Sequence, residues 1–260
     1  MTDRKLDDIF AKTLVDDYDD DAPWAAVNAL RGIGSRDVFD YAVAWCRSGN
    51  SLRRARGADV LAQLGKTSDH PVNFADESFA ILVDQAGDEI ESLPLLGAIH
   101  ALGHLGNPLA VPSICQHRLH PNADVRFAVA CALGSFANDP IAVETLLLLT
   151  QDVDEDVRDW ATFGLGVLGN SDSPEIRDAL ARCLDDTAQD VREEAMAGLA
   201  SRKDRRAVPA LLTALEGPRM SEAIREAASE MLGREEEAAS WTGTDYARAL
   251  RERFGPKAEQ

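Results

Sequence analysis

Histidines are the residues of this chain best placed to do chemistry. Four of the five fall between His100 and His120, with Cys115 among them. His100 and His104 are four positions apart, so on a helix both imidazoles lie on one face and could bind one metal ion. His117 and His120 fall near the turn that begins the next predicted helix, and no acidic residue accompanies the first two histidines on theirs. The sequence therefore favours polar or exposed histidines, and no metal ligand is assigned.

No other motif defines a catalytic site. The chain lacks a phosphate-binding glycine loop, a GxSxG elbow and a usable Ser/His/Asp order. No catalytic residue and no cofactor are assigned, and the sequence favours a non-enzymatic protein. The alternative is an accessory lyase or a metal-dependent enzyme with a groove site near His100 and His104.

The charge of the chain bears on its partners. The 260 residues carry a formal net charge of −18, and a field of that sign repels nucleic-acid phosphates and anionic lipids. Two short basic clusters run against this trend and are more typical of a solvated or salt-bridged surface. They are Arg47, Arg53, Arg54 and Arg56, and Arg202, Lys203, Arg205 and Arg206. A nucleic-acid-binding repair protein is a second alternative, which the net charge disfavours.

The cysteines and the apolar runs indicate a compartment. The four cysteines are scattered, at positions 46, 115, 131 and 183, without a CxxC pair. With no apolar signal region at the N-terminus, this usage indicates a reducing, cytoplasmic setting. No stretch approaches the ~18 consecutive apolar residues of a membrane span, so no membrane association is expected.

The elements that would position these residues follow an internal repeat. Asp-Val-Arg occurs at 124–126, 156–158 and 190–192, and each copy opens a run of small and apolar residues. Leucines at positions 30, 61, 102, 133, 165, 199 and 232 lie 31, 41, 31, 32, 34 and 33 residues apart, which indicates helical pairs with one insertion, at 66–73. The predicted helices cover 5–15, 24–33, 38–47, 52–64, 74–86, 93–105, 108–117, 124–136, 141–150, 156–168, 174–184, 190–200, 207–216, 221–232 and 246–254.

This repeat resembles the HEAT-like repeats first described in phycobilin lyases. The resemblance is carried by Asp-Val-Arg, alanine-rich spacing and a Leu-Gly ending, and it is clearest over 156–169 and 124–134. It covers about residues 22–233 and implies an all-α fold, an armadillo-like α-solenoid (superhelix) of about seven HEAT-like helical pairs. We expect residues 1–21 to form a helix and an acidic linker, and 234–260 an acidic segment and a capping helix. The resemblance specifies no chemistry, because scaffolds, adaptors and a few enzymes share the repeat.

The inner helix of each pair carries an unusual stripe. Counting from the valine of Val-Arg as position zero, positions four, five, seven and eight are small or apolar and should be buried, whereas two, six and ten should face the open groove. In flanking repeats the outward positions are polar, as at Asp59, Gln63, Glu193 and Ser201. In the central repeats, positions two, six and ten, and position three at Trp160, are instead largely apolar or aromatic. The candidate partner-binding residues are Leu96, His100, His104, Phe127, Cys131, Trp160, Phe163 and Val167.

An apolar patch rimmed by charge is typical of a binding surface. The sequence therefore predicts a protein-interaction scaffold or adaptor. Its partner would be a protein or peptide on the concave face, or a second copy of the chain. The opposing interpretation is that curvature or the terminal segments bury these side chains.

The arginine of each Val-Arg pair has a structural interpretation. Equivalent arginines occur beside acidic residues at helix starts, and a ladder of ion pairs between neighbouring repeats would fix their register. The expected ladder consists of Arg126, Arg158, Arg192 and Arg225 with Asp124, Asp156, Asp190 and Glu222.

Overall fold

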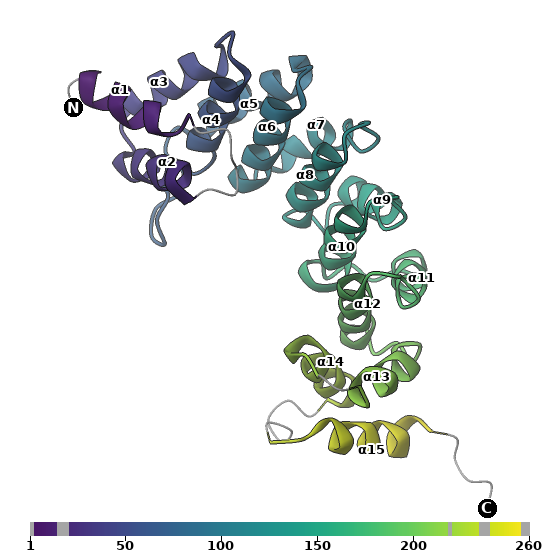
Figure 1. Cartoon of the computed structure of the whole chain (residues 1–260). Coiled ribbons are helices and arrows are strands. Elements are labelled where there is room, and N and C mark those ends of the chain that lie inside the picture. The colour runs from purple at the N-terminus through teal and green to yellow at the C-terminus, as the bar shows by residue number, and fades with distance from the viewer. Residues whose placement is uncertain (1–2, 15–20, 218–219, 234–239, 256–260) are drawn as a thin grey trace, which may run out of the picture. The chain divides into compact units, whose positions relative to one another are not determined.

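The computed structural model describes residues 3–14, 21–217, 220–233 and 240–255 (Figure 1). Every regular element within these ranges is helical, and helical pairs follow one another along the chain, which confirms the predicted all-α solenoid. Most of the acidic stretches at 16–21 and 235–237 lie outside the described residues. The chain divides into two compact units, Met1–Phe136 and Ala137–Gln260. They are called the N-terminal and C-terminal units, and each is described by itself.

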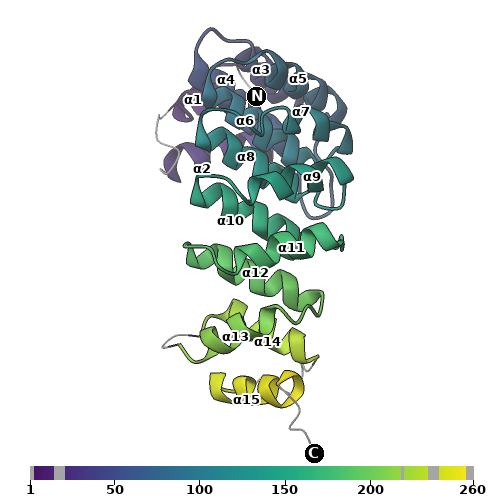
Figure 2. The ribbon, with the colours of Figure 1, turned by 90° about the vertical axis from the view of Figure 1, so that its right-hand side faces the viewer.

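The N-terminal unit consists of two rows of helices (Figures 1 and 2). In the inner row, α4 packs on α6 and α6 on α8; in the outer row, α3 packs on α5 and α5 on α7. The helix α2 packs on α4, and α1 packs on α2. The elements are α1 (Asp3–Lys12), α2 (Asp21–Ile33), α3 (Arg36–Cys46), α4 (Ser51–Ala62), α5 (Ala75–Asp88), α6 (Ser92–Leu105), the 3-10 turn η1 (Pro108–Ala110), α7 (Val111–Cys115) and α8 (Ala123–Gly134).

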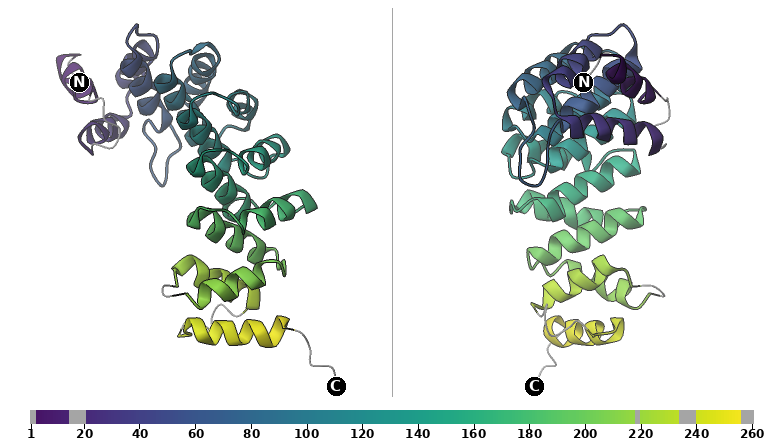
Figure 3. Two further views of the ribbon diagram at one scale, coloured as in Figure 1. Left: turned by 45° about the vertical axis from the view of Figure 1, so that its right-hand side comes forward. Right: turned by 90° about the vertical axis from the view of Figure 1, so that its left-hand side faces the viewer.

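The C-terminal unit repeats this arrangement (Figure 3). Its inner helices α10, α12 and α14 pack in sequence, α9 packs on α11, and the last helix, α15, packs on α13 and α14. The elements are α9 (Pro140–Leu149), α10 (Glu155–Phe163), the π-helical turn η2 (Gly164–Leu168), α11 (Pro174–Cys183), α12 (Gln189–Ser201), α13 (Ala207–Leu215), α14 (Glu222–Leu232) and α15 (Gly243–Phe254).

Side-chain capping explains where the inner helices begin. The carboxylate of Asp154 accepts hydrogen bonds from the backbone N–H groups of Asp156 and Val157, and the amide oxygen of Asn122 does the same at the start of α8. These bonds satisfy N–H groups that have no partner within the helix. The Asp-Val-Arg copies at 124–126 and 156–158 therefore each begin two residues after a side-chain cap, whereas at the third copy the N-cap residue is Ala188, which makes no such bond.

Small residues let the inner helices approach closely. A Cβ atom placed on Gly103 of α6 would lie 2.8 Å from the Cα of Ala132 on α8. One placed on Gly198 of α12 would lie 2.6 Å from the Cα of Gly166. The positions expected to be buried are buried in both Asp-Val-Arg helices that were compared, as at Leu133 and Leu165. The repeat pattern thus encodes tight backbone-to-backbone packing.

Two predicted helices differ in the structure. The segment predicted over 108–117 is a 3-10 turn followed by one short helix, Val111–Cys115, because Pro112 lacks an N–H group and only a short apolar face is available to bury. The segment predicted over 156–168 changes from α-helix to a π-helical turn at Gly164. Gly164 and Gly166 permit this widening, since they have no side chain to crowd it.

The repeat arginines hold the turn that precedes their own helix. In each of four inner helices the guanidinium donates to the backbone carbonyl six residues earlier, at 2.7–3.0 Å. The pairs are Arg54 with Ser48, Arg126 with His120, Arg158 with Asp152, and Arg192 with Asp186. In these bonds the acceptor is the turn backbone, whereas the expected acceptors were the helix-start carboxylates Asp124, Asp156 and Asp190. Arg225 differs, and binds Glu222 three residues earlier.

Two of these arginines also bind the following repeat. Arg158 donates through two nitrogens to the carboxylate of Asp186, at 2.8 and 2.9 Å. Arg54 binds Glu89 in the same two-pronged way, at 2.7 and 3.0 Å. The nearby guanidinium holds the pKa of Asp186 below its usual range. A planar guanidinium bound to one carboxylate fixes both distance and orientation, so these pairs set the register between neighbouring repeats.

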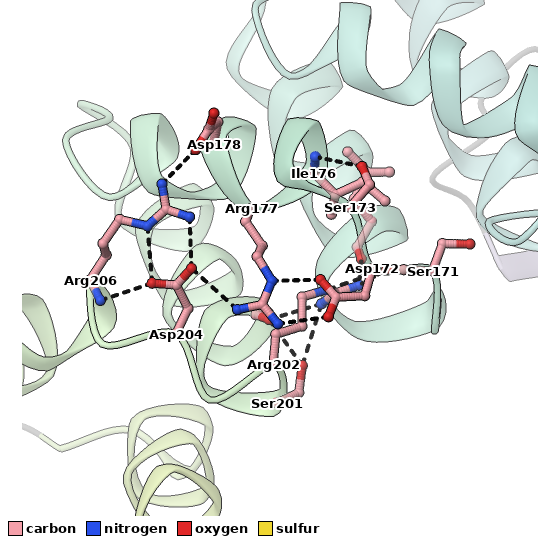
Figure 4. A network of polar contacts seen from close by, with 12 residues as sticks. Ser171, Asp172, Ser173, Ile176, Arg177, Asp178, Ser201, Arg202, Asp204 and Arg206 are labelled. Carbon is pink, nitrogen blue, oxygen red and sulfur yellow. Dashed lines mark hydrogen bonds and ion pairs between the residues drawn. The ribbon is translucent and has the colours of Figure 1, made fainter.

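The second basic cluster of the sequence is a structural network (Figure 4). Arg206 binds Asp204 and Asp178, while Arg177 binds Asp172 and reaches Asp204 at 3.5 Å. The hydrogen bond from Arg206 lowers the pKa of Asp204 to about 2. Opposite charges thus alternate across two repeats.

Arg202 belongs to the same region but binds mainly backbone, apart from the hydroxyl of Ser201 at 3.3 Å. Its buried guanidinium donates to the carbonyls of Leu165, Gly166, Gly169, Ser171 and Gly198, at 2.8–3.3 Å. Four of these carbonyls belong to the π-helical turn and the loop after it. Arg202 therefore stabilises the C-terminal end of the preceding inner helix, formed by α10 and η2.

The first basic cluster contains a buried charge. Arg56 is fully buried; its Nε donates to the carbonyl of Thr13 at 2.9 Å, and its NH1 lies 3.2 Å from the carboxylate of Asp59. The ring of Trp24 lies 5.1 Å from the guanidinium carbon. Asp59 was expected to face the groove as a polar residue, but it is buried beside Arg56, which Thr13 and Trp24 contact.

Candidate partner-binding face

The first five candidate residues lie on two adjacent inner helices of the N-terminal unit. Leu96, His100 and His104 are on α6, whereas Phe127 and Cys131 are on α8. None belongs to the buried core: His104 is exposed and the other four are half-buried. The rings of His100 and Phe127 meet edge to face with centroids 6.4 Å apart. These five residues are called the N-terminal face.

Both histidines of this face have lowered pKa values. Burial, and then the neighbouring His104, lower the pKa of His100 to about 4. Burial also lowers the pKa of His104, with Arg31 and Lys66 adding to the effect. With a pKa of about 4, the imidazole of His100 is not suited to proton transfer near neutral pH. Among the described residues, no three His, Cys, Asp or Glu side chains converge to hold a metal ion.

The other three candidates lie on the C-terminal unit. Trp160 and Phe163 are on α10, and Val167 is in the π-helical turn that continues it. Trp160 is 36% exposed and Val167 46% exposed, while Phe163 is half-buried. The two rings meet edge to face, with centroids 5.7 Å apart. These three residues, called the C-terminal face, form an apolar surface at positions where soluble repeats usually carry polar groups.

Two carboxylates border the C-terminal face. Asp159 precedes Trp160 on α10, and Glu194 occupies on α12 the repeat position that Trp160 occupies on α10. Both are half-buried, and the Oδ1 atom of Asp159 is buried without a hydrogen-bond partner. Burial raises the pKa of both groups; for Glu194, burial and the charges of Asp159, Glu193 and Asp190 bring it to about 7. Glu194 was not among the sequence candidates, although its repeat position was available as a signal.

A groove lies elsewhere in the C-terminal unit. A cavity of about 640 Å³ lies between α13 and the pair formed by α11 and α12. Arg192, Glu193 and Arg206 bring both signs of charge to its wall, and Met196 and Ile224 bring apolar surface. This mixture selects no single class of ligand.

Comparison with known proteins identifies the class. The family model for HEAT repeats matches residues 80–166 and 147–233, more than half of the chain. The chain therefore belongs to the HEAT-repeat family, which confirms the resemblance read from the Asp-Val-Arg repeats. Within the described part of the chain, no helix is long and apolar enough to cross a membrane.

Individual relatives are similar along most of the chain. Protein YibA of Escherichia coli K12 is 30% identical over 234 residues, which cover 88% of this chain and 81% of YibA. The crystal structure of Escherichia coli YibA superposes with a TM-score of 0.72 at 26% identity, covering 96% of this chain and 93% of that one.

Two more distant structures share the fold alone. The structure of the CpcE–CpcF complex of phycocyanin lyase from Nostoc sp. PCC7120 matches with a TM-score of 0.50 at 14% identity, covering 95% of this chain and 94% of the matched chain. The structure of Kap95p bound to RanGDP matches with a TM-score of 0.59 at 14% identity, covering 96% of this chain and 38% of the matched chain. Both likenesses show the solenoid fold.

Proposed function

We propose that this protein is a non-catalytic scaffold or adaptor that binds a protein or peptide on the inner helices of its repeats. The observation that carries the proposal is the set of apolar and aromatic side chains outside the core on α6, α8 and α10. Water-exposed apolar surface of this kind is usually retained for binding. The fold supports the proposal, because stacked repeats offer one extended surface per row of helices.

The compartment is part of the same proposal. All four cysteines are free thiols, and three of them are buried. Such usage suits a reducing environment, so we place the scaffold in the cytoplasm. The net charge of −18 and the engagement of both basic clusters in internal contacts argue against nucleic acid as the partner.

Affinity purification from the native source tests the proposal. The bait variants are Phe127→Ser for the N-terminal face, and Trp160→Ser and Val167→Ser for the C-terminal face. Matched controls are Leu119→Ser and Val153→Ser, which remove apolar side chains that are 72% and 93% exposed in turns. We expect at least one face variant to lose a reproducibly captured partner about tenfold, since central apolar contacts contribute about 1–3 kcal/mol each, while both controls retain it.

The outcome against the proposal is equally definite. If all face variants fold, as verified by circular dichroism, and still capture the same proteins, the inner helices are not the binding surface. Size-exclusion chromatography of the same variants tests the second copy of the chain as the partner. Because Val167 is well exposed, its serine variant is expected to fold even where an aromatic substitution does not.

A further inference from the structure

The partly buried carboxylates of the C-terminal unit fall into two groups. Asp186 and Asp204 each bind an arginine, with closest distances of 2.8 and 2.6 Å. Among the described residues of that unit, Asp159 and Glu194 bind no arginine, although they lie on adjacent inner helices that pack together. Burial without a cation costs free energy. The fold therefore tolerates two uncompensated carboxylates beside an exposed aromatic surface.

Resting on the function proposed above, we propose that Asp159, Glu194, Trp160 and Phe163 form a docking site for an arginine side chain of a partner peptide. The guanidinium binds the two carboxylates. The ring of Trp160 contacts its flat face or its aliphatic stem, and Phe163 with Val167 receives an apolar neighbour of the arginine. The site thus selects a basic peptide with an apolar residue next to its arginine.

Charge complementarity favours a cation as the occupant. The groups that shift the pKa of Glu194 are Asp159, Glu193 and Asp190, and those that shift the pKa of Asp159 are Asp190 and Asp156; all are acidic. A neutral apolar peptide would bury these carboxylates further without compensating them. An anionic partner would add to the repulsion.

Arginine suits the site better than lysine. Its planar guanidinium has five N–H donors and can serve two carboxylates at once, whereas an ammonium group acts as a point charge. It is also more weakly hydrated and stacks on aromatic rings. The same geometry recurs inside this protein, where Arg206 bridges Asp204 and Asp178 and lies at 2.6 Å from each.

The test uses the full chain and an array of short peptides. Each peptide has one central arginine between varied apolar residues, and each has two partners with citrulline or lysine in its place. Citrulline keeps the shape of arginine and removes its charge. We expect a subset of arginine peptides to bind, with citrulline at least about tenfold weaker and lysine in between, as the loss of a charged hydrogen-bonded pair implies.

Variants then assign the site. Asp159→Asn and Glu194→Gln conserve volume and should weaken the arginine peptides about tenfold each, while leaving the citrulline peptides unchanged. The matched control is Glu144→Gln, which removes one exposed charge from α9. Calorimetry near pH 7 in buffers of different ionisation enthalpy should show proton release on binding, because a bound cation favours the ionised form of Glu194.

The outcomes separate the inference from the proposed function. If no arginine peptide binds, or citrulline peptides bind equally well, the inference is wrong. If Trp160→Ser loses the native partner while Asp159→Asn and Glu194→Gln retain it, the scaffold function stands and the arginine site is excluded. If every face variant retains the native partner, the proposed function itself fails.

Discussion

In the N-terminal unit, repeat positions three and six of α4 are Arg56 and Asp59, which form a buried ion pair beneath Thr13 and Trp24. In the C-terminal unit, position three is Trp160 on α10 and Glu194 on α12, and the charged groups that shift the pKa of Glu194 are all acidic. The same stripe of the repeat is thus covered and neutralised in one unit, while in the other it carries uncompensated carboxylates beside an exposed aromatic ring.

This difference teaches what a polar residue on an inner helix means. Asp59 is buried beside Arg56, whose guanidinium donates to the carbonyl of Thr13 and lies against the ring of Trp24. At the other end of the chain, α15 packs on α13 and α14. A carboxylate at a given repeat position is therefore structural or available according to what covers it, and not according to its position alone.

The largest expected effect comes from breaking the covered pair. Arg56→Met removes the cation that pairs with the buried carboxylate of Asp59, which we expect to destabilise the fold by about 3–5 kcal/mol. Urea denaturation followed by circular dichroism measures the change. Arg47→Met, in the exposed turn before α4, is the control and should change stability by less than about 0.5 kcal/mol. A loss below about 1 kcal/mol for Arg56→Met would mean that the packing of Thr13 and Trp24 on α4 does not depend on the ion pair.

The ladder should give an intermediate effect. Arg158→Ala removes the two bonds to Asp186 and the bond to the Asp152 carbonyl, and we expect a loss of about 1–3 kcal/mol. Arg182→Ala, an exposed arginine on α11, is the control. Equal stability of the two variants would show that backbone packing alone sets the register.

The pH dependence of stability provides a second test of the Arg158–Asp186 pair. The folded pKa of Asp186 lies below its unfolded value, so its contribution to stability is present above about pH 4 and is lost as pH falls through the folded pKa. Arg158→Ala should therefore reduce the acid sensitivity of the wild-type protein, and denaturation midpoints across this range measure it.

The smallest expected effect is a gain in stability rather than a loss. The folded pKa of Glu194, about 7, lies above its unfolded value, so ionisation costs stability as pH rises from about 4.5 to 7. Glu194→Gln should stabilise the protein by about 1 kcal/mol above pH 7, after allowance for solvent screening. The gain should vanish near pH 4. Glu144→Gln should show no such dependence, and a destabilised Glu194→Gln would indicate an unrecognised internal partner for this carboxylate.

Sequence periodicity predicted the fold well because the repeat is local. Leu133 and Leu165 are buried as their spacing required, and the Asp-Val-Arg copies begin inner helices behind the caps Asn122 and Asp154. The π-helical turn could not be predicted in this way, because it depends on the guanidinium of Arg202, more than thirty residues away.

The candidate site was only partly predictable, for a related reason. Position on the repeat indicates that Trp160 and Val167 lie outside the core, and the structure places them there. It does not indicate that Arg56 and Asp59 are buried against Thr13 and Trp24, since that contact depends on tertiary packing. Nor does it single out Glu194, whose significance comes from Asp159 on the neighbouring helix. The role of these residues in binding stays a prediction.

The contacts of Arg202 have a consequence for how the chain opens. One side chain at the end of α12 holds carbonyls of the π-helical turn and of the loop that follows it. Fraying of α12 therefore releases the end of the preceding inner helix at the same moment, which couples two repeats into a single unfolding unit. In hydrogen exchange, amides near Gly166 and Gly198 would then share one opening free energy and exchange together.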